Sequence, residues 1–195
     1  ASIGLPWDLN AEISWTPPIQ INNSKPDNLW GAAISKPILN NEKIGLGLRL
    51  FLVRGGAIAS VTCSENNLNF EPYTLQNTAG CIALSDDKLK MDHEGIEIFL
   101  SLTNSSAILP WISLASSNLD NSVEINAPLE VGRERATVYS SGTTQTISFG
   151  FTYDFNEDWS FNASSSYTPL DVRRPNYNSG NDNFWNVRFG LTMKY

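Results

Sequence analysis

The single histidine of the chain, His93, is the residue best suited to acid–base chemistry or metal binding. It lies between Asp92 and Glu94 in the segment KMDHEGIE, where a serine, histidine and acid arrangement or a metal site is conceivable. Serines are too numerous to mark a nucleophile, and adjacent strand residues point to opposite faces, so they do not converge on one ion. We therefore expect His93 to be a solvated loop residue, and we predict no catalytic residue, metal site or cofactor.

The two cysteines, Cys63 and Cys81, flank the polar segment SENNLNFEPYTLQNTAG. Two cysteines that bracket one loop suggest a disulfide formed in an oxidising compartment. Such a bond would stabilise the fold by roughly 3 kcal/mol in the chain-entropy account. A pair of unlinked thiols is the alternative.

The bulk composition narrows the class of protein. A chain of 195 residues fits one domain over residues 1–195, and its net charge of -7 argues against nucleic-acid binding. Only 17% of the residues are charged and 11% are aromatic, which is typical of a β-rich chain. The most apolar stretch, IGLGLRLFLVRGGAIASV, is interrupted by Arg49 and Arg54. This excludes a transmembrane helix but not membrane-spanning strands, which need only alternation.

Period-two alternation of apolar and polar residues is the main structural signal. It is clearest in the C-terminal segment FWNVRFGLTMKY, where large apolar residues share one face of the expected strand. The same test predicts eight strands in total. They lie at residues 5–15, 29–38, 44–52, 95–102, 108–116, 146–155, 159–168 and 184–195.

The connections between these strands alternate in length. NNEK, TNSSA and NED are short and turn-forming, whereas the other four connections are long and polar. Short turns at one end and long loops at the other are the layout of an antiparallel up-and-down transmembrane β-barrel. Both termini would then lie at the short-turn end. The long stretch at 118–141 leaves open whether an additional hairpin raises the strand count above eight.

Charged residues and aromatic residues occupy different positions on these strands. The charges fall on the face opposite the apolar one, which suits a narrow lumen filled by small side chains and paired ions. This expected lumen network comprises Asp8, Glu12, Arg49, Glu97, Asp154, Arg188 and Lys194. Aromatic residues mark strand ends about 20–25 Å apart along the axis, the spacing of two membrane-interface girdles. These are Trp7, Trp15, Trp159, Tyr167, Trp185 and Tyr195.

The ending RFGLTMKY resembles the C-terminal recognition signal of outer-membrane barrel proteins. The matching residues are Arg188, Gly190, Met193 and Tyr195, although Met193 stands where an aromatic residue is usual. With the alternating loop lengths, the chain resembles small eight-stranded barrels of the OmpA and OmpX type. The resemblance is architectural and points to no individual family. It implies a bacterial outer-membrane location, contact with the barrel-assembly machinery, periplasmic termini and extracellular long loops.

Closure of such a barrel would pair the last strand with the first, because an open edge in hydrocarbon leaves backbone groups unpaired. That pairing would place Arg188 and Lys194 near Asp8 and Glu12 in at least one salt bridge. The interior of an eight-stranded barrel is filled by side chains, so a wide pore is not expected.

Three functions follow in order of preference. The first is a structural or surface-interaction protein that acts through its long extracellular loops, alone or as a subunit of a larger membrane assembly. The second is a narrow channel for small or hydrophobic solutes, and the third is a lipid-modifying enzyme. Arg173 and Arg174 are candidates for contact with lipopolysaccharide phosphates, ordinary loop charges being the alternative. The expected partners are outer-membrane lipid, lipopolysaccharide and a protein bound at the loops or the barrel wall.

Overall fold

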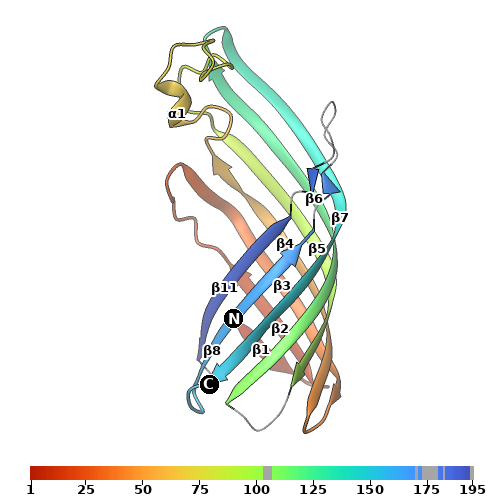
Figure 1. The fold of residues 1–195 in the computed structure, drawn as a ribbon. Helices are drawn as coiled ribbons and strands as arrows, with labels where there is room; N and C mark the ends of the chain where they lie inside the picture. Colours follow the sequence, from red (N-terminus) through yellow and green to blue (C-terminus); the bar gives the residue numbers. More distant parts are fainter. Residues whose placement is uncertain (103–106, 170, 173–179, 182, 194–195) are drawn as a thin grey trace.

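The fold is known from a computed structural model, which describes residues 1–102, 107–169, 171–172, 180–181 and 183–193. Nine strands form one strongly curled antiparallel sheet, a half-barrel, in which the strands are arranged in the order in which they follow along the chain (Figure 1). Within the described ranges, no helix is both long and apolar enough to cross a bilayer. The architecture is therefore all-β and up-and-down, as the alternation predicts.

The sheet has the order β1-β2-β3-β4-β5-β6-β7-β8-β11. Its strands are β1 (Ser2–Leu5), β2 (Leu9–Trp15), β3 (Ser24–Asn40), β4 (Ile44–Ala59), β5 (Asp87–Leu102), β6 (Ile108–Leu129), β7 (Gly132–Asp154), β8 (Trp159–Thr168) and β11 (Phe184–Met193). The remaining elements are a one-turn helix, α1 (Glu65–Leu68), and a separate pair of short strands, β9 (Asp171–Val172) and β10 (Gly180–Asn181).

The first predicted strand, 5–15, is wrong as a single element. Residues Trp7 and Asp8 both have positive φ, 64° and 59°, and they turn the chain back so that β1 pairs with β2. Ala1 consequently lies beside Ile13, with which it exchanges two hydrogen bonds of 2.7 and 2.8 Å, rather than at the short-turn end. Among the described residues β1 and β11 are the two edges of the sheet, and they do not pair with each other.

The stretch at 118–141 is also different from the prediction, because it is neither a loop nor an additional hairpin. Strands β6 and β7 simply continue in register from Ile108↔Tyr153 to Leu129↔Gly132. Along the upper part of this hairpin, Val123, Ile125 and Ala127 alternate with the polar Glu124 and Asn126. The two long strands project the hairpin well beyond the ends of β2, β8 and β11 (Figure 1).

Two short turns lie at the opposite end of the sheet, and in each an asparagine side chain closes the turn. The Asn41 side-chain oxygen accepts the backbone N–H groups of Lys43 and Ile44, each at 2.9 Å. The Asn156 oxygen does the same for Asp158 and Trp159. An asparagine that closes its own turn in this way explains why NNEK and NED form tight connections.

The two faces of the sheet differ in chemistry, as the alternation predicts. One face carries Leu50, Ile98, Leu114 and Phe149, of which between 45% and 60% of each side chain is exposed. The opposite face carries glycines and small polar residues, and the glycines provide the space for the few large side chains there. A Cβ at Gly47 would lie 2.1 Å from the ring of Phe99, and one at Gly95 would lie 2.7 Å from the ring of Phe51.

Candidate functional site

A cluster of ionised side chains lies on the polar face near the centre of the sheet. The Arg49 guanidinium contacts the Glu12 carboxylate at 2.8 Å and the Glu97 carboxylate at 3.1 Å. Strands β2, β4 and β5 position the three residues, and Arg49 also lies 6.0 Å from the ring centroid of Phe51. One cation held between two carboxylates leaves this cluster with a formal charge of -1.

The other members of the expected network are not brought to this cluster. Asp8 lies in the β1–β2 turn, Asp154 at the end of β7, and Arg188 on β11, while Lys194 lies outside the described residues. No ion pair joins Arg188 to Asp8 or Glu12 in the part of the chain that the structure describes. The N-terminal segment folds back on β2, and among the described residues β11 pairs with β8 and not with β1 or β2. The Arg188 part of the predicted salt bridge is therefore not formed, and the Lys194 part lies outside the described residues.

His93 was expected in a loop and instead lies within β5, half-buried on the polar face. Its Nε2 lies 2.7 Å from the Ser117 hydroxyl, and Ser117 in turn lies 2.9 Å from the Thr144 hydroxyl. The prediction was wrong because β5 continues its pairing with β4 up to Asp87. Ser117 is only 5% exposed, so the pair has little access to a substrate.

The acidic neighbours of His93 point away from it, as expected for adjacent strand residues. Asp92 pairs with Arg54 at 3.2 Å on the other face of the sheet, which leaves the histidine without that carboxylate as an orienting group. No group of three or more histidine, cysteine, aspartate or glutamate side chains that could hold a metal ion is found among the described residues.

The most highly organised part of the molecule is what we call the distal lobe, residues 60–86 together with residues 118–142 of the β6–β7 hairpin. Cys63 and Cys81 form a disulfide, as predicted. Both cysteines are buried against Ala127 and Leu129 of β6. The disulfide therefore joins the two ends of the 63–81 segment, and its packing against Ala127 and Leu129 holds this segment on the β6–β7 hairpin.

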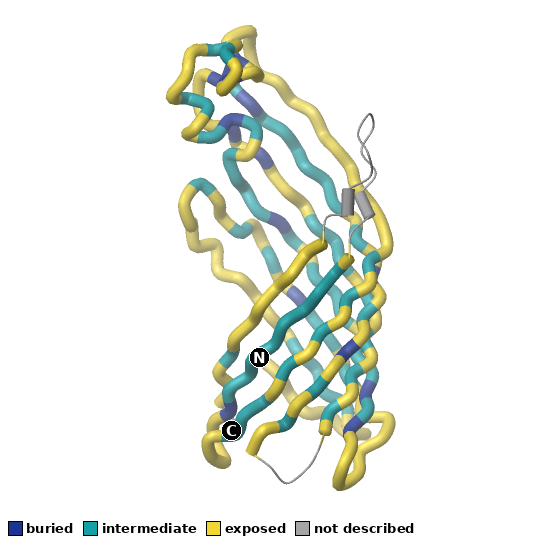
Figure 2. The backbone as a smooth tube through the Cα atoms, viewed as in Figure 1, coloured by how far each residue is buried: buried dark blue, intermediate teal, exposed yellow. Residues whose placement is uncertain are grey.

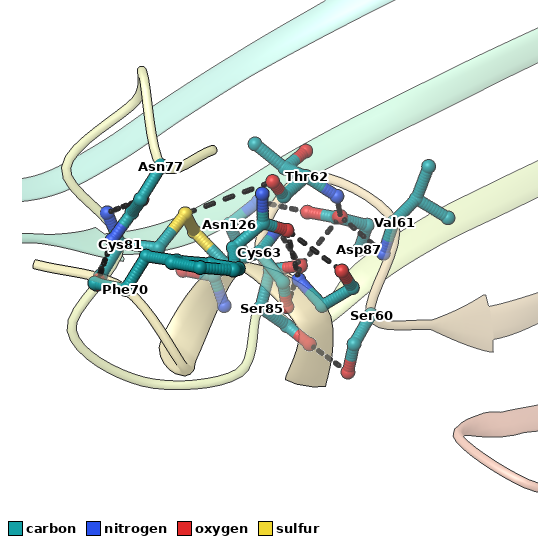
Figure 3. Close-up of a disulfide and its surroundings, with 12 residues drawn as sticks. Ser60, Val61, Thr62, Cys63, Phe70, Asn77, Cys81, Ser85, Asp87 and Asn126 are labelled. Atoms are coloured by element: carbon teal, nitrogen blue, oxygen red, sulfur yellow. Dashed lines mark hydrogen bonds between the residues drawn. A yellow bond between two sulfur atoms is a disulfide. The ribbon is translucent and has the colours of Figure 1, made fainter. Parts of the chain in front are cut away.

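Two of the buried polar side chains in this region hold the distal lobe together (Figure 3). The Asn77 amide donates to the carbonyl oxygens of Phe70 and Cys81 and accepts the N–H of Cys81 at 2.8 Å. This amide closes the loop around the disulfide. Asn77 is fully buried, and its two hydrogen bonds with Cys81 are shielded from water.

Asp87, at the start of β5, is the second buried polar residue and connects three segments of chain. Its carboxylate accepts the N–H groups of Val61 at 3.1 Å and Thr62 at 2.7 Å, the Ser85 hydroxyl at 2.8 Å and the N–H of Asn126 at 2.9 Å (Figure 3). We call this arrangement the Asp87 latch. It ties both ends of the 60–86 loop to β6.

The electrostatics of the latch favour the ionised carboxylate. Burial would raise the pKa of Asp87, but hydrogen bonds from the Thr62 and Asn126 backbone and from Ser85 outweigh it and hold the pKa below its ordinary value. The latch is therefore strongest where Asp87 is charged. The role of Asp87 was not predicted, because Val61, Thr62 and Asn126 lie far from it in the sequence. The role of Asn77 was not predicted either, although its partners Phe70 and Cys81 are only seven and four residues away.

The outer edge of the β6–β7 hairpin is a further feature that sequence reasoning missed. Strand β8 covers β7 only from Ile147 to Asp154, whereas β6 pairs with β7 along its whole length. Residues 133–143, which we call the β7 edge segment, are all exposed, and Figure 2 shows them as a continuous exposed strand on the rim of the distal lobe. The alternating Val123, Ile125 and Ala127 could have revealed this hairpin.

Of the five predicted aromatic girdle residues that the structure describes, all but Trp7 lie at or near strand ends. Tyr167 of β8 and Trp185 of β11 form a cross-strand pair with ring centroids 4.9 Å apart, and Trp159 lies opposite Met193 at the other end of the same two strands. Trp15 ends β2. Trp7 occupies the β1–β2 turn rather than a strand and is 82% exposed.

The remaining predicted residues are placed only in part. Arg188, Gly190 and Met193 of the assembly signal lie on β11. Tyr195, together with the candidate lipopolysaccharide contacts Arg173 and Arg174, lies outside the described residues. Comparison with known proteins found no matching family and no matching curated protein.

Proposed function

We propose that this chain is an outer-membrane protein whose curled sheet anchors the distal lobe at the cell surface, where the lobe binds macromolecular partners. The observation that carries the proposal is the contrast between the two halves of the molecule. The distal lobe is closed by a buried disulfide and by the Asp87 latch, whereas the half near the short turns carries an exposed apolar face. An ordered lobe on an apolar support suits recognition more than catalysis.

The apolar face supports the membrane part of the proposal. Exposed Leu50, Ile98 and Phe149 would cost free energy in water, roughly 1 kcal/mol for each, because about half of each residue is exposed. Hydrocarbon would remove that cost. Strand β8 runs from Trp159 to Thr168, which at about 3.3 Å per residue and a tilt of about 40° spans roughly 25 Å along the axis. That height matches the apolar band of outer-membrane barrels.

A lobe-deletion variant tests the proposal. Ala59 pairs with Asp87, and Asn118 with Thr143, so residues 60–86 and 119–142 can each be replaced by a two-residue turn at a matched position. We expect this variant to keep heat-modifiable gel mobility and membrane insertion. We expect the full chain in nanodiscs to bind intact cells and purified lipopolysaccharide, and the lobe-deletion variant to lose this binding. Equal binding by both proteins would contradict the proposal.

A narrow channel is the second candidate, and the cluster of Glu12, Arg49 and Glu97 on the polar face favours it. Charged side chains that line a lumen control ion passage. Single-channel recording of the refolded protein in planar bilayers separates the two functions. Discrete openings that change in Glu12→Ala or Arg188→Ala would make the channel the better assignment, whereas a silent bilayer with a folded protein supports the surface role.

A further inference from the structure

Along one side of the β7 edge segment, the backbone groups have no strand partner in the part of the chain that the structure describes. Among the described residues, β6 covers its other side, and the pairing with β8 begins only at Ile147. Every residue from Arg133 to Thr143 is exposed. An edge of this length is a template on which another extended chain can pair.

The composition of the segment makes pairing more favourable. Natural edge strands are usually protected by lysine, proline or a bulge, and this stretch contains none of these. Its charges are confined to Arg133, Glu134 and Arg135 at the tip, while the following ATVYSSGT is uncharged and contains β-branched and aromatic residues. The exposed Val138 and Tyr139 lie in the middle of this uncharged run.

We propose that the β7 edge segment pairs with the same segment of a second copy of this chain, in antiparallel orientation about a two-fold axis through Val138. This proposal deepens the proposed function and rests on it. Residues directly opposite each other in a sheet point to the same face, whereas successive residues of one strand point to opposite faces. A two-fold axis normal to the sheet must therefore pass through a position where a residue lies opposite its own copy, and it cannot pass between two successive positions. Val138 then lies opposite the second copy's Val138, and Thr137 lies opposite the second copy's Tyr139. About ten backbone hydrogen bonds join the copies over residues 133–143.

Charge favours this antiparallel register over a parallel one. Opposite Arg133, Glu134 and Arg135 the register places Thr143, Gly142 and Ser141 of the second copy, so no like charges meet. Parallel pairing in register would set each of these three charges against its own copy, which is destabilising. A β-branched residue opposite an aromatic one, as in the Thr137 and Tyr139 pair, adds to the stability of the antiparallel arrangement.

The orientation has a consequence for where the two copies are anchored. A two-fold axis normal to the sheet reverses the strand direction, so the two curled sheets point away from each other and lie in facing membranes. Val138 and Ile147 are nine positions apart, about 30 Å of strand, so the two apolar bands are separated by up to about 60 Å along the strands. The partner is therefore a copy on another membrane, and the distal lobe acts as a homophilic contact.

Single-cysteine variants test both the partner and the register, because Cys63 and Cys81 are already bonded to each other. Val138→Cys brings two thiols within disulfide distance, and we expect dimers to form under mild oxidation of the protein in nanodiscs. Arg133→Cys alone should not form dimers, whereas Arg133→Cys mixed with Thr143→Cys should. Dimers from Arg133→Cys alone would indicate parallel pairing and overturn the register.

A second measurement does not depend on cysteines. Proteoliposomes carrying the chain with the lobe outward should cluster, and Val138→Lys should reduce the clustering at least about fivefold because a lysine on the edge blocks pairing. The matched control is Val131→Lys, which introduces the same change at an exposed valine of the hairpin tip, outside the segment. Absence of clustering together with absence of Val138→Cys dimers overturns the proposal. Cross-linking of Val138→Cys to a different polypeptide in native membranes also overturns it.

The two proposals can fail separately. If lobe deletion abolishes binding to cells while Val138→Lys leaves both binding and clustering unchanged, the surface role stands and the pairing between copies is wrong. If the bilayer recordings show a channel and the lobe-deletion variant still binds cells, the proposed function is wrong whatever the state of the β7 edge segment.

Discussion

Replacement of Asp87 by asparagine should open the distal lobe without unfolding the sheet. In the Asp87 latch one carboxylate oxygen accepts three donors, from Val61, Thr62 and Ser85, and the other accepts the N–H of Asn126. The best orientation of an amide keeps its oxygen at the first position. Its NH₂ group then faces the N–H of Asn126, so two donors meet.

The size of the effect follows from these four contacts. Three hydrogen bonds lose their charged acceptor and the fourth is lost with its donor unsatisfied, which together cost about 3 kcal/mol. Expressed as local opening, this lowers the hydrogen-exchange protection of the Thr62 and Asn126 amides by about 100-fold. Amides in the middle of β4 and β5 should keep their protection, because their ladder does not include the latch.

Hydrogen exchange of the protein in nanodiscs, read by mass spectrometry or NMR, measures this directly. Asp86→Asn is the matched control, since Asp86 is the exposed neighbour and loses the same charge. If the amides of Thr62 and Asn126 in Asp87→Asn stay within about threefold of their wild-type protection, the latch does not hold the lobe and the reasoning is refuted.

Further predictions concern pH, redox state and the polar face. Because the pKa of Asp87 is lowered from 3.8, the latch contributes fully above that pH and loses strength as the pH falls below it, so lobe proteolysis should rise only in strong acid and Asp87→Asn should flatten that rise. Replacing both Cys63 and Cys81 by serine should cost roughly 3 kcal/mol of lobe stability and make residues 60–86 protease-sensitive, with heat-modifiable mobility retained; unchanged cleavage would contradict this. Arg49→Met should lower the free energy of unfolding in urea by about 2 kcal/mol, because the carboxylates of Glu12 and Glu97 lose the cation that lies between them. Arg54→Met removes a more exposed pair and should cost less than about 1 kcal/mol, so equal losses would argue against a special role for the Arg49 cluster.

The strands were predictable because the alternation of apolar and polar residues can be seen within each segment by itself. Each strand has one apolar and one polar face whatever its neighbours are, so the segment at 44–52 is recognisable from its own leucines. The turn at Trp7 and Asp8 was not predictable in the same way. Positive φ is uncommon for non-glycine residues, and the apolar alternation from Leu5 to Trp15 continues through the turn without interruption.

The distal lobe shows where sequence reasoning stops. A disulfide could be inferred from the spacing of Cys63 and Cys81, but the buried Asp87 looks like any other acidic residue beside Asp86. Its role depends on backbone groups of Thr62 and Asn126, which the sheet brings together from positions far apart in the chain. The position of His93 was missed for a related reason, since polar composition around it concealed a paired strand.

The short strand β1 determines how this sheet could become a closed barrel. In an antiparallel sheet of nine strands the first and last run in the same direction, so β1 and β11 cannot be joined by an antiparallel ladder. Strand β2 runs opposite to β11 and could form that ladder, but β1 occupies the edge that it would use. Antiparallel closure therefore requires strand exchange, in which β1 leaves β2 as β11 arrives. As the structure stands, the N-terminal hairpin covers the edge of β2 that a closing β11 would need.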